Sequence, residues 1–280
     1  MILQSLLFEA KYEVPSAWKG HEIIANYLIR YLNPNIFVEL GVHNGFSYFS
    51  FCQSVFETKS KTKCFAVDNW TGDKHAGFYE DYVFQQVNSH NHNNYLNFSK
   101  LLKMNFDDAL NQFKDNSIDL LHIDGYHTYE QVKHDFNSWR PKLSDDAVIL
   151  FHDVNEFRDD FGVHKLFEEL KKIYKYHVMF PFAHGLGLIQ SEKAKKEKLV
   201  INFLKENEEI IKILQFLHNK NQKNLNLTQA TQAKEQEIVN LTQVTQAKEQ
   251  EINEILNSTC WKISSPLRFL AGIKNKLLNN

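Results

Sequence analysis

The chain has 280 residues, of which 43% are hydrophobic and 24% are charged, with a formal net charge of −2 and a pI near 6.7. This balance is typical of a globular protein and excludes a strongly basic nucleic-acid-binding protein. No stretch reaches the ~18 uninterrupted apolar residues of a membrane span, and Glu9 ends the N-terminal apolar run too early for a secretory signal, so we expect a cytoplasmic protein. Cys52, Cys64 and Cys260 lie far apart without a CxxC spacing, which argues against a disulfide framework or a zinc site.

Residues 1–195 alternate short apolar runs with stretches of helical spacing. The four clearest runs are IFVEL (36–40), KCFAVD (63–68), IDLLHID (118–124) and AVILFHD (147–153). Continuous apolar strands separated by helices predict a mostly parallel α/β sheet that is buried on both faces, a Rossmann-like doubly wound fold with its site at the carboxyl ends of the strands. Two further runs, 176–180 and 184–190, resemble a closing antiparallel hairpin.

A glycine-containing turn follows the first predicted strand. Its residues are Glu39, Gly41, Gly45 and Ser47, in the pattern ExGxxxGxS. Glycines at such a turn let backbone N–H groups approach a ligand closely. We expect Gly41 and Gly45 to admit an adenosyl amino acid and Glu39 to orient its ammonium group.

Asp68 ends the second predicted strand, where an acidic residue in nucleotide-binding sheets accepts hydrogen bonds from both ribose hydroxyls. A GxGxxG dinucleotide fingerprint would need glycine where the chain has His43 and Phe46, which disfavours a nicotinamide oxidoreductase. The same Phe46 replaces the lysine of a phosphate-binding P-loop. The pattern therefore favours a ligand without a pyrophosphate.

Asp124 and Asp153 end the third and fourth apolar runs. Neighbouring parallel strands lie ~4.8 Å apart, so the two carboxylates can share one hard cation such as Mg²⁺ or Mn²⁺. A bound cation lowers the pKa of a substrate hydroxyl, and His127, three residues after Asp124, can accept the proton near an unperturbed pKa of ~6.5. The alternative is that both aspartates cap helices.

Several segments resemble class I S-adenosylmethionine-dependent methyltransferases, of the bacterial branch that includes sugar and macrolide-sugar O-methyltransferases and cephalosporin-hydroxylase-like proteins. They occur in this order: VELGVHNGFS (38–47), VDNWTGDKHAG (67–77), LLHIDGYHTYEQVKHDF (120–136), LFHD (150–153) and FAHGLGL (182–188). The resemblance implies S-adenosyl-L-methionine as cofactor and methyl transfer to a sugar hydroxyl in bacterial surface glycan or related glycoconjugate biosynthesis, often with a divalent cation.

The resemblance also implies residue roles. Trp70 would pack beside the ribose, with the protein core as the alternative, and Phe106 and Asp107 would border the adenine, with helix capping as the alternative for Asp107. Related metal-dependent enzymes carry two adjacent acidic or amide residues at the last of these strands, whereas this chain has HDVN at 152–155. The third metal ligand is therefore His152, Asn155 or water.

From residue 193 to 257 the chain contains neither glycine nor proline, and NLTQATQAKEQEIV (226–239) is followed by NLTQVTQAKEQEIN (240–253). A 14-residue period equals two heptads and predicts a helical coiled coil over 196–257, able to form a homo-oligomer, with a single solvated helix as the alternative. Residues 258–280 carry four basic and no acidic residues. They predict an amphipathic tail for an anionic membrane at the inner face or for a glycan-assembly partner.

The leading function is thus an O-methyltransferase acting on a sugar or glycoconjugate acceptor. The alternative is a non-catalytic, cofactor-binding protein that recruits glycan-assembly enzymes through the coiled coil. The combination of Asp124, His127 and Asp153 favours the enzyme, because a scaffold has no use for it.

Overall fold

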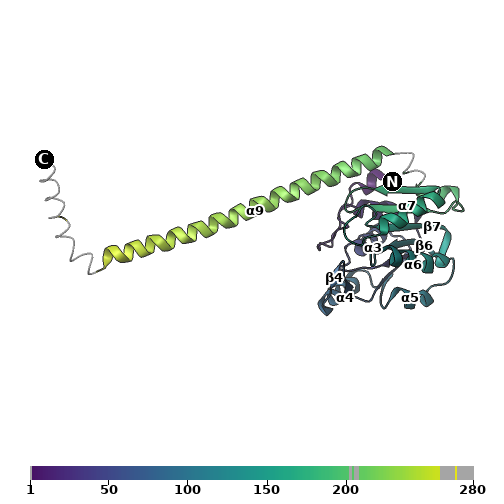
Figure 1. Ribbon diagram of the computed structural model, residues 1–280, viewed down its shortest axis with the longest axis horizontal. Helices are drawn as coiled ribbons and strands as arrows, with labels where there is room; N and C mark the ends of the chain where they lie inside the picture. Colours follow the sequence, from purple (N-terminus) through teal and green to yellow (C-terminus); the bar gives the residue numbers. More distant parts are fainter. Residues whose placement is uncertain (1, 202–203, 205–207, 259–268, 270–280) are drawn as a thin grey trace. The chain divides into compact units, whose positions relative to one another are not determined.

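The computed structural model describes residues 2–201, 204, 208–258 and 269. The chain divides into two compact units, Met1–His218 and Asn219–Asn280. Figure 1 shows the elements along the chain. Among the described residues, no helix is long and apolar enough to cross a membrane.

The first unit is built on one seven-stranded sheet, whose strands follow the order β5-β2-β1-β6-β7-β9-β8. Their bounds are β1 Ile36–Leu40, β2 Lys63–Asp68, β5 Ser99–Lys103, β6 Ile118–Ile123, β7 Leu143–His152, β8 Tyr176–Phe180 and β9 Leu186–Gln190. The strands from β5 to β7 pair in parallel. β9 pairs antiparallel with both β7 and β8. The predicted Rossmann-like, mostly parallel sheet is confirmed.

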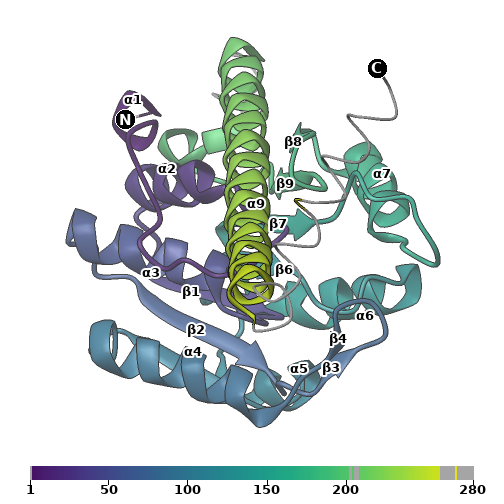
Figure 2. The ribbon, with the colours of Figure 1, turned by 90° about the vertical axis from the view of Figure 1, so that its left-hand side faces the viewer.

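Helices cover both faces of the sheet, as the apolar strands require. Their bounds are α1 Ile2–Ser5, α2 Glu22–Leu32, α3 Phe46–Thr58, α4 Asp81–Asn94, α5 Phe106–Ala109, α6 Tyr129–Trp139 and α7 Val163–Ile173. Residues of α2, α3 and α4 belong to one buried apolar cluster, and residues of α5, α6 and α7 belong to another. Figure 2 shows these two groups of helices on either side of the strands. The sheet therefore separates two cores.

Two local structures differ from what the sequence pattern suggests. The edge strand β5 has the sequence SKLLK, in which only Leu101 and Leu102 are apolar, so it lacks the continuous apolar run of the inner strands. His90 and His92, which an asparagine-rich stretch would place in a loop over the site, lie on helix α4. An HxH metal site there is not formed, because His90 packs against Tyr12, Phe49 and Tyr95.

The first compact unit extends past the predicted boundary at residue 195. Val200, Ile201, Leu204 and Leu214 are buried in the cluster that contains α2 and α3, so the chain keeps contributing to this core up to His218. Helix α9 runs from Glu208 to Asn257 and contains the 14-residue repeat. The predicted helix is present, and the predicted pairing of such helices stays a prediction. Most of the predicted amphipathic tail, 259–268 and 270–280, lies outside the described residues.

Candidate active site

The carboxyl ends of β1, β2, β6 and β7 surround one cavity of about 810 Å³. The chain leaves β1 toward β2 on one side, and β6 lies on the other side of β1, so the order of strands reverses here. Open α/β sheets bind ligands at such a switch point. The glycine loop after β1, Asp68, Asp124 and Asp153 all line the cavity, as the sequence predicted.

The fold itself requires glycine at both positions of the loop. Gly41 has φ +83°, and a Cβ there would lie 2.1 Å from the carbonyl oxygen of Asp124. Gly45 has φ +85°, and a Cβ there would lie 2.8 Å from the ring of Phe49. The expectation that Gly41 is needed for the approach of a ligand is therefore incomplete, because a side chain at 41 collides first with the backbone after β6.

Asp68 organises this loop through its carboxylate. Oδ2 accepts hydrogen bonds from the backbone N–H groups of Val42 at 2.8 Å and His43 at 3.1 Å. Oδ1 accepts one from the N–H of Trp70 at 2.7 Å. A carboxylate offers about four lone-pair positions, so Asp68 retains room for one ribose hydroxyl at Oδ1 rather than for both.

Glu39 does not face the cavity. It is fully buried, accepts a hydrogen bond from Ser47 Oγ at 2.7 Å, and pairs with His122 Nδ1 at 3.0 Å. Burial raises the pKa of Glu39, and the contacts with His122 and Ser47 oppose that rise. The prediction that Glu39 itself faces a ligand ammonium is therefore wrong; its carboxylate instead holds the hydroxyl of Ser47, which does line the cavity.

The three residues assigned to the ribose and adenine have different places. Trp70 is buried in the core, packs on Phe84 and donates its indole N–H to the carbonyl of His43, so the core alternative is correct for its ring. Phe106 lines the cavity. Asp107 also lines it, but its carboxylate pairs with His134 at 3.0 Å. The cap of helix α5 is Asn105, so Asp107 is not the predicted N-cap.

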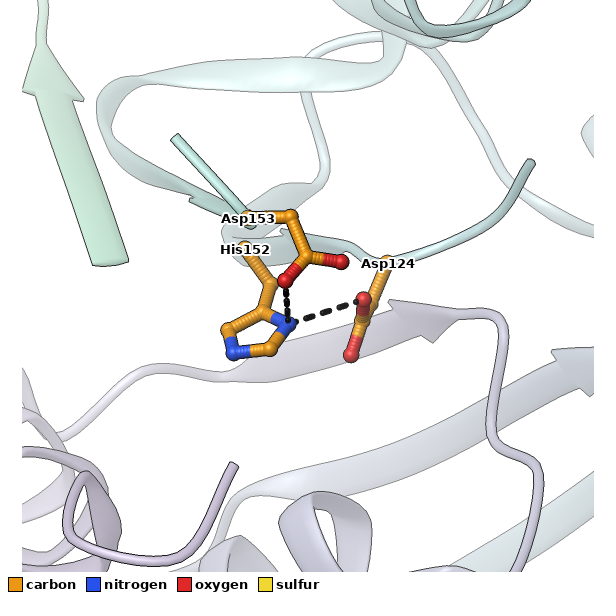
Figure 3. Close-up of side chains that lie close together, drawn as sticks. All are labelled: Asp124, His152 and Asp153. Atoms are coloured by element: carbon orange, nitrogen blue, oxygen red, sulfur yellow. Dashed lines mark ion pairs between the residues drawn. The ribbon is translucent and has the colours of Figure 1, made fainter. Parts of the chain in front are cut away.

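Asp124, His152 and Asp153 form a compact cluster at the ends of β6 and β7 (Figure 3). The pairing of Ile123 with Phe151 sets Asp124 beside His152. His152 Nδ1 lies 3.2 Å from Asp124 Oδ1 and 3.3 Å from Asp153 Oδ1, while its Nε2 lies 3.0 Å from the carbonyl oxygen of Ala183. One ligand atom from each of the three residues lies within 4.8 Å of the others.

The backbone conformation at Asp153 also helps to orient the side chains of this cluster. Asp153 has φ +60°, a left-handed conformation that costs a non-glycine residue about 1–2 kcal/mol and is common at functional sites. Asn155, the competing candidate for the third ligand, donates its side-chain amide to the carbonyl of Pro181. Of the three alternatives, the structure thus brings His152 to the carboxylates and directs Asn155 elsewhere.

His127 completes the cluster, with Nε2 at 2.9 Å from Asp153 Oδ2 and 3.4 Å from Asp124 Oδ1. Burial lowers the pKa of His127, but the hydrogen bonds that its ring donates to both carboxylates outweigh burial and raise the pKa to about 10. The same balance raises the pKa of His152 to about 9. Without a cation His127 is therefore protonated at neutral pH, and the predicted unperturbed value near 6.5 is wrong for this state.

The pKa values of the two carboxylates shift in the opposite direction to those of the histidines. Burial acts to raise the pKa of Asp124, but His152 and His127 outweigh it and hold that pKa well below its usual range. The pKa of Asp153 is lowered for the same reason. The cluster is therefore two carboxylates balanced by two imidazolium groups.

Sequence reasoning missed a second group of residues on the acceptor side of the cavity. The rings of His75 and His127 both stack on Phe161, and His75 Nε2 pairs with Asp160. Arg158 also lines this side, with its guanidinium 5.3 Å from the Phe161 ring. His75 lies in the GDKHAG segment at 72–77. No sequence signal linked it to 158–161, because the contact joins loops about 85 positions apart.

Residues 38–154 match a family model described as a methyltransferase domain. This range contains the glycine loop, Asp68 and the acid cluster, and the match confirms the methyltransferase domain expected from the sequence. It covers less than half of the chain.

One curated relative is the uncharacterized protein y4gI of Sinorhizobium fredii (strain NBRC 101917 / NGR234), which is 47% identical over 174 residues. The alignment covers 62% of this chain and 19% of that protein, so this chain spans about a fifth of the length of the relative it matches.

Solved structures with similar folds include a putative caffeoyl-CoA O-methyltransferase from Staphylococcus aureus, at 16% identity and TM-score 0.47, covering 64% of this chain and 86% of that one. Another is the O-methyltransferase TomG from Streptomyces achromogenes in complex with SAM, at 13% identity and TM-score 0.47, covering 64% and 82%. With TM-scores below 0.5, neither likeness supports a statement about the function of this chain.

Proposed function

We propose that the first unit transfers a methyl group from S-adenosyl-L-methionine to a hydroxyl of a sugar or glycoconjugate, with a divalent cation at Asp124, His152 and Asp153. The observation that carries the proposal is that this cluster opens into the same cavity as the glycine loop, at the switch point of a methyltransferase-type domain. A methyl donor and an activated hydroxyl must meet in one cavity for direct transfer.

The charges that line the cavity suit a cationic methyl donor. In the described part of the chain, seven aspartates line it, against Arg158 and the two protonated histidines of the cluster, His127 and His152, so the negative charges outnumber the positive ones. A sulfonium compound carries positive charge that such a lining stabilises. The loop from Gly41 to Ser47 would hold the amino-acid end, Asp68 Oδ1 one ribose hydroxyl, and Phe106 the adenine.

The donor set of the acid cluster suits Mg²⁺ or Mn²⁺, because two carboxylates supply hard oxygen ligands. His152 fits as a third ligand: its Nε2 faces the Ala183 carbonyl, which favours the tautomer with a free Nδ1. When bound there, the cation neutralises the carboxylates and polarises an acceptor hydroxyl. With the carboxylates neutralised, the pKa of His127 would fall, so its Nε2 would lose its proton to solvent and could then accept the proton of that hydroxyl.

The acceptor side supports a ring-shaped, hydroxyl-bearing acceptor. Tyr126 and Phe161 line it beside His75, so flat apolar faces lie next to the polar acid cluster. A sugar offers both an apolar C–H face and vicinal hydroxyls. Together with the sequence resemblance, this combination favours a sugar hydroxyl as the methylated group.

Calorimetric titration of the full chain tests the donor: S-adenosylmethionine and S-adenosylhomocysteine should bind and NAD should not. Binding of NAD alone would contradict the proposal. Titration with Mn²⁺, followed by electron paramagnetic resonance, tests the cation. Asp124→Asn should lower Mn²⁺ affinity at least about tenfold, whereas Asp135→Asn, which alters an aspartate of the same cavity outside the cluster, should not. Equal Mn²⁺ affinity in both variants would remove the cation from the site.

A further inference from the structure

The second compact unit presents an apolar stripe that nothing in the described chain covers. Within it, Leu227, Ile238, Leu241, Ile252 and Ile255 are 51–68% exposed. They occupy a and d positions of alternate heptads on α9, so they lie on one side of the helix. A long helix with such a stripe is stabilised when the stripe is buried against another helix.

The stripe is interrupted by polar side chains at a fixed interval. Thr231 and Lys234 occupy one turn of the seam, and Thr245 and Lys248 occupy the equivalent turn one repeat later. Each 14-residue repeat therefore carries an apolar half followed by a threonine–lysine half. The orientation of a second helix decides whether the lysines of the threonine–lysine halves face lysines or threonines.

In a parallel, in-register pair of identical helices, each seam residue faces its own copy. Lys234 would then face Lys234 of the partner subunit, and Lys248 would face the partner's Lys248. Two layers of like charge at the seam oppose association in this orientation.

In an antiparallel pair the a positions face d positions, and the repeat becomes complementary to itself. When Ile238 of one copy faces Leu241 of the other, the remaining layers are fixed by the heptad spacing. They are Leu227 with the partner's Ile252, Thr231 with the partner's Lys248, Lys234 with the partner's Thr245, and Asn224 with the partner's Ile255. No layer then contains two lysines, and the pairing uses only residues of the second unit.

We propose that residues 224–255 of two copies of this chain associate as an antiparallel coiled coil centred between Ile238 and Leu241. The occupant of the stripe is a second copy of the same segment, because the reversed register joins the apolar layers and sets each of Lys234 and Lys248 against a threonine instead of against another lysine. This pairing joins two catalytic units and is independent of what those units methylate.

Sedimentation of the full chain is the first test. The wild type should be a concentration-dependent dimer, and Ile238→Asn with Leu241→Asn should make it monomeric. Val239→Asn is the matched control, since Val239 is exposed but lies outside the seam. A wild-type monomer at about 100 μM, or a double variant that still dimerises, would overturn the proposal.

Spin labels distinguish the two orientations. Cysteines are introduced at Gln229 or Gln250 in a Cys260→Ser background; Cys52 and Cys64 are buried. At 1.5 Å per residue, two labels at position 229 should be about 30 Å apart along the axis of the antiparallel pair, and a 229–250 mixture should give a short distance. The reverse result, short for 229–229 and long for the mixture, would show a parallel pair.

A charge change gives an independent test. In the variant with Thr231→Glu and Thr245→Glu, both new carboxylates face lysines of the partner in the antiparallel pair. The affinity of the dimer should therefore rise up to about tenfold at low salt, and this gain should be lost at high salt. Gln232→Glu with Gln246→Glu adds the same charge one position away from the seam and should change the affinity less than threefold. Weakening by the threonine changes would contradict the antiparallel register.

Discussion

The two sides of the cavity use their acidic residues in opposite ways. On the β1–β2 side, Asp68 is engaged by three backbone N–H groups and Glu39 is buried against Ser47 and His122. On the β6–β7 side, Asp124 and Asp153 face two histidines inside the cavity. On the first side the carboxylates thus accept hydrogen bonds that shape the loop. On the second side they lie inside the cavity and pair only with histidine side chains.

The largest effect is expected where the glycine loop after β1 contacts the backbone after β6. Gly41→Ala places a Cβ against the Asp124 carbonyl at 2.1 Å, so we expect a loss of more than about 4 kcal/mol in the free energy of unfolding, or no folded protein. Gly77→Ala is the control, because Gly77 also has positive φ, at +84°, but no atom lies within 4 Å of its added Cβ. It should cost about 1–2 kcal/mol. Equal losses in urea unfolding would show that the contact at Gly41 is unimportant.

The next largest effect is expected on the β6–β7 side. His127→Ala should leave affinity for S-adenosylmethionine unchanged and lower turnover about 10²–10⁴-fold, the usual contribution of a positioned base. His184→Ala, at the rim of the same cavity and paired with Glu156, should change turnover less than tenfold. Formation of S-adenosylhomocysteine on the acceptor accepted by the wild type is the measurement. Wild-type turnover in the His127 variant would assign the base elsewhere, with His75 the next candidate.

On the β1–β2 side, Asp68→Asn should lower stability even without a ligand. An amide offers one acceptor oxygen in place of two, so at least one backbone N–H loses its partner, at a cost of about 1–3 kcal/mol. Asp108→Asn, an exposed aspartate of the same cavity, should stay within about 0.5 kcal/mol. Ligand-free unfolding curves that coincide with the wild type would mean that Asp68 serves only the ribose.

Asp135 gives an effect that depends on pH and vanishes in acid. Burial raises its pKa to about 6, against the hydrogen bond from Gln131. Because the folded-state pKa lies above the unfolded value, the stability that Asp135 contributes is present below about pH 4 and is lost as the pH rises through 6. Asp135→Asn should therefore be more stable than the wild type at pH 8, by about 1–3 kcal/mol, and similar to it at pH 4. Thermal unfolding at both pH values measures this, and a constant difference would contradict the raised pKa.

Much of the site was predictable from strand ends alone. Apolar runs that end in Gly41, Asp68, Asp124 and Asp153 predicted residues at one edge of a parallel sheet, and all four line one cavity. The direction of each side chain was not predictable. Glu39 and Trp70 stand at the same edge but turn into buried contacts with His122 and Phe84, which come from other elements.

The pKa of His127 shows the same limit. The sequence put a histidine three residues after Asp124 but gave no reason to expect Asp153 at 2.9 Å from its ring, and this second carboxylate helps to raise the pKa to about 10. Likewise, SKLLK at β5 has too few apolar residues to stand out, because an edge strand needs less apolar surface than an inner one.

The class of fold, the glycine loop, the aspartates at the strand ends and the helical repeat were all predictable, because each follows from local spacing along the chain. Three other features depend on the folded structure: which carboxylates accept hydrogen bonds from backbone N–H groups, that His152 rather than Asn155 faces Asp124, and that the first unit extends to His218. These outcomes depend on contacts between residues distant in sequence, whose positions are set when β6, β7 and β9 align in one sheet.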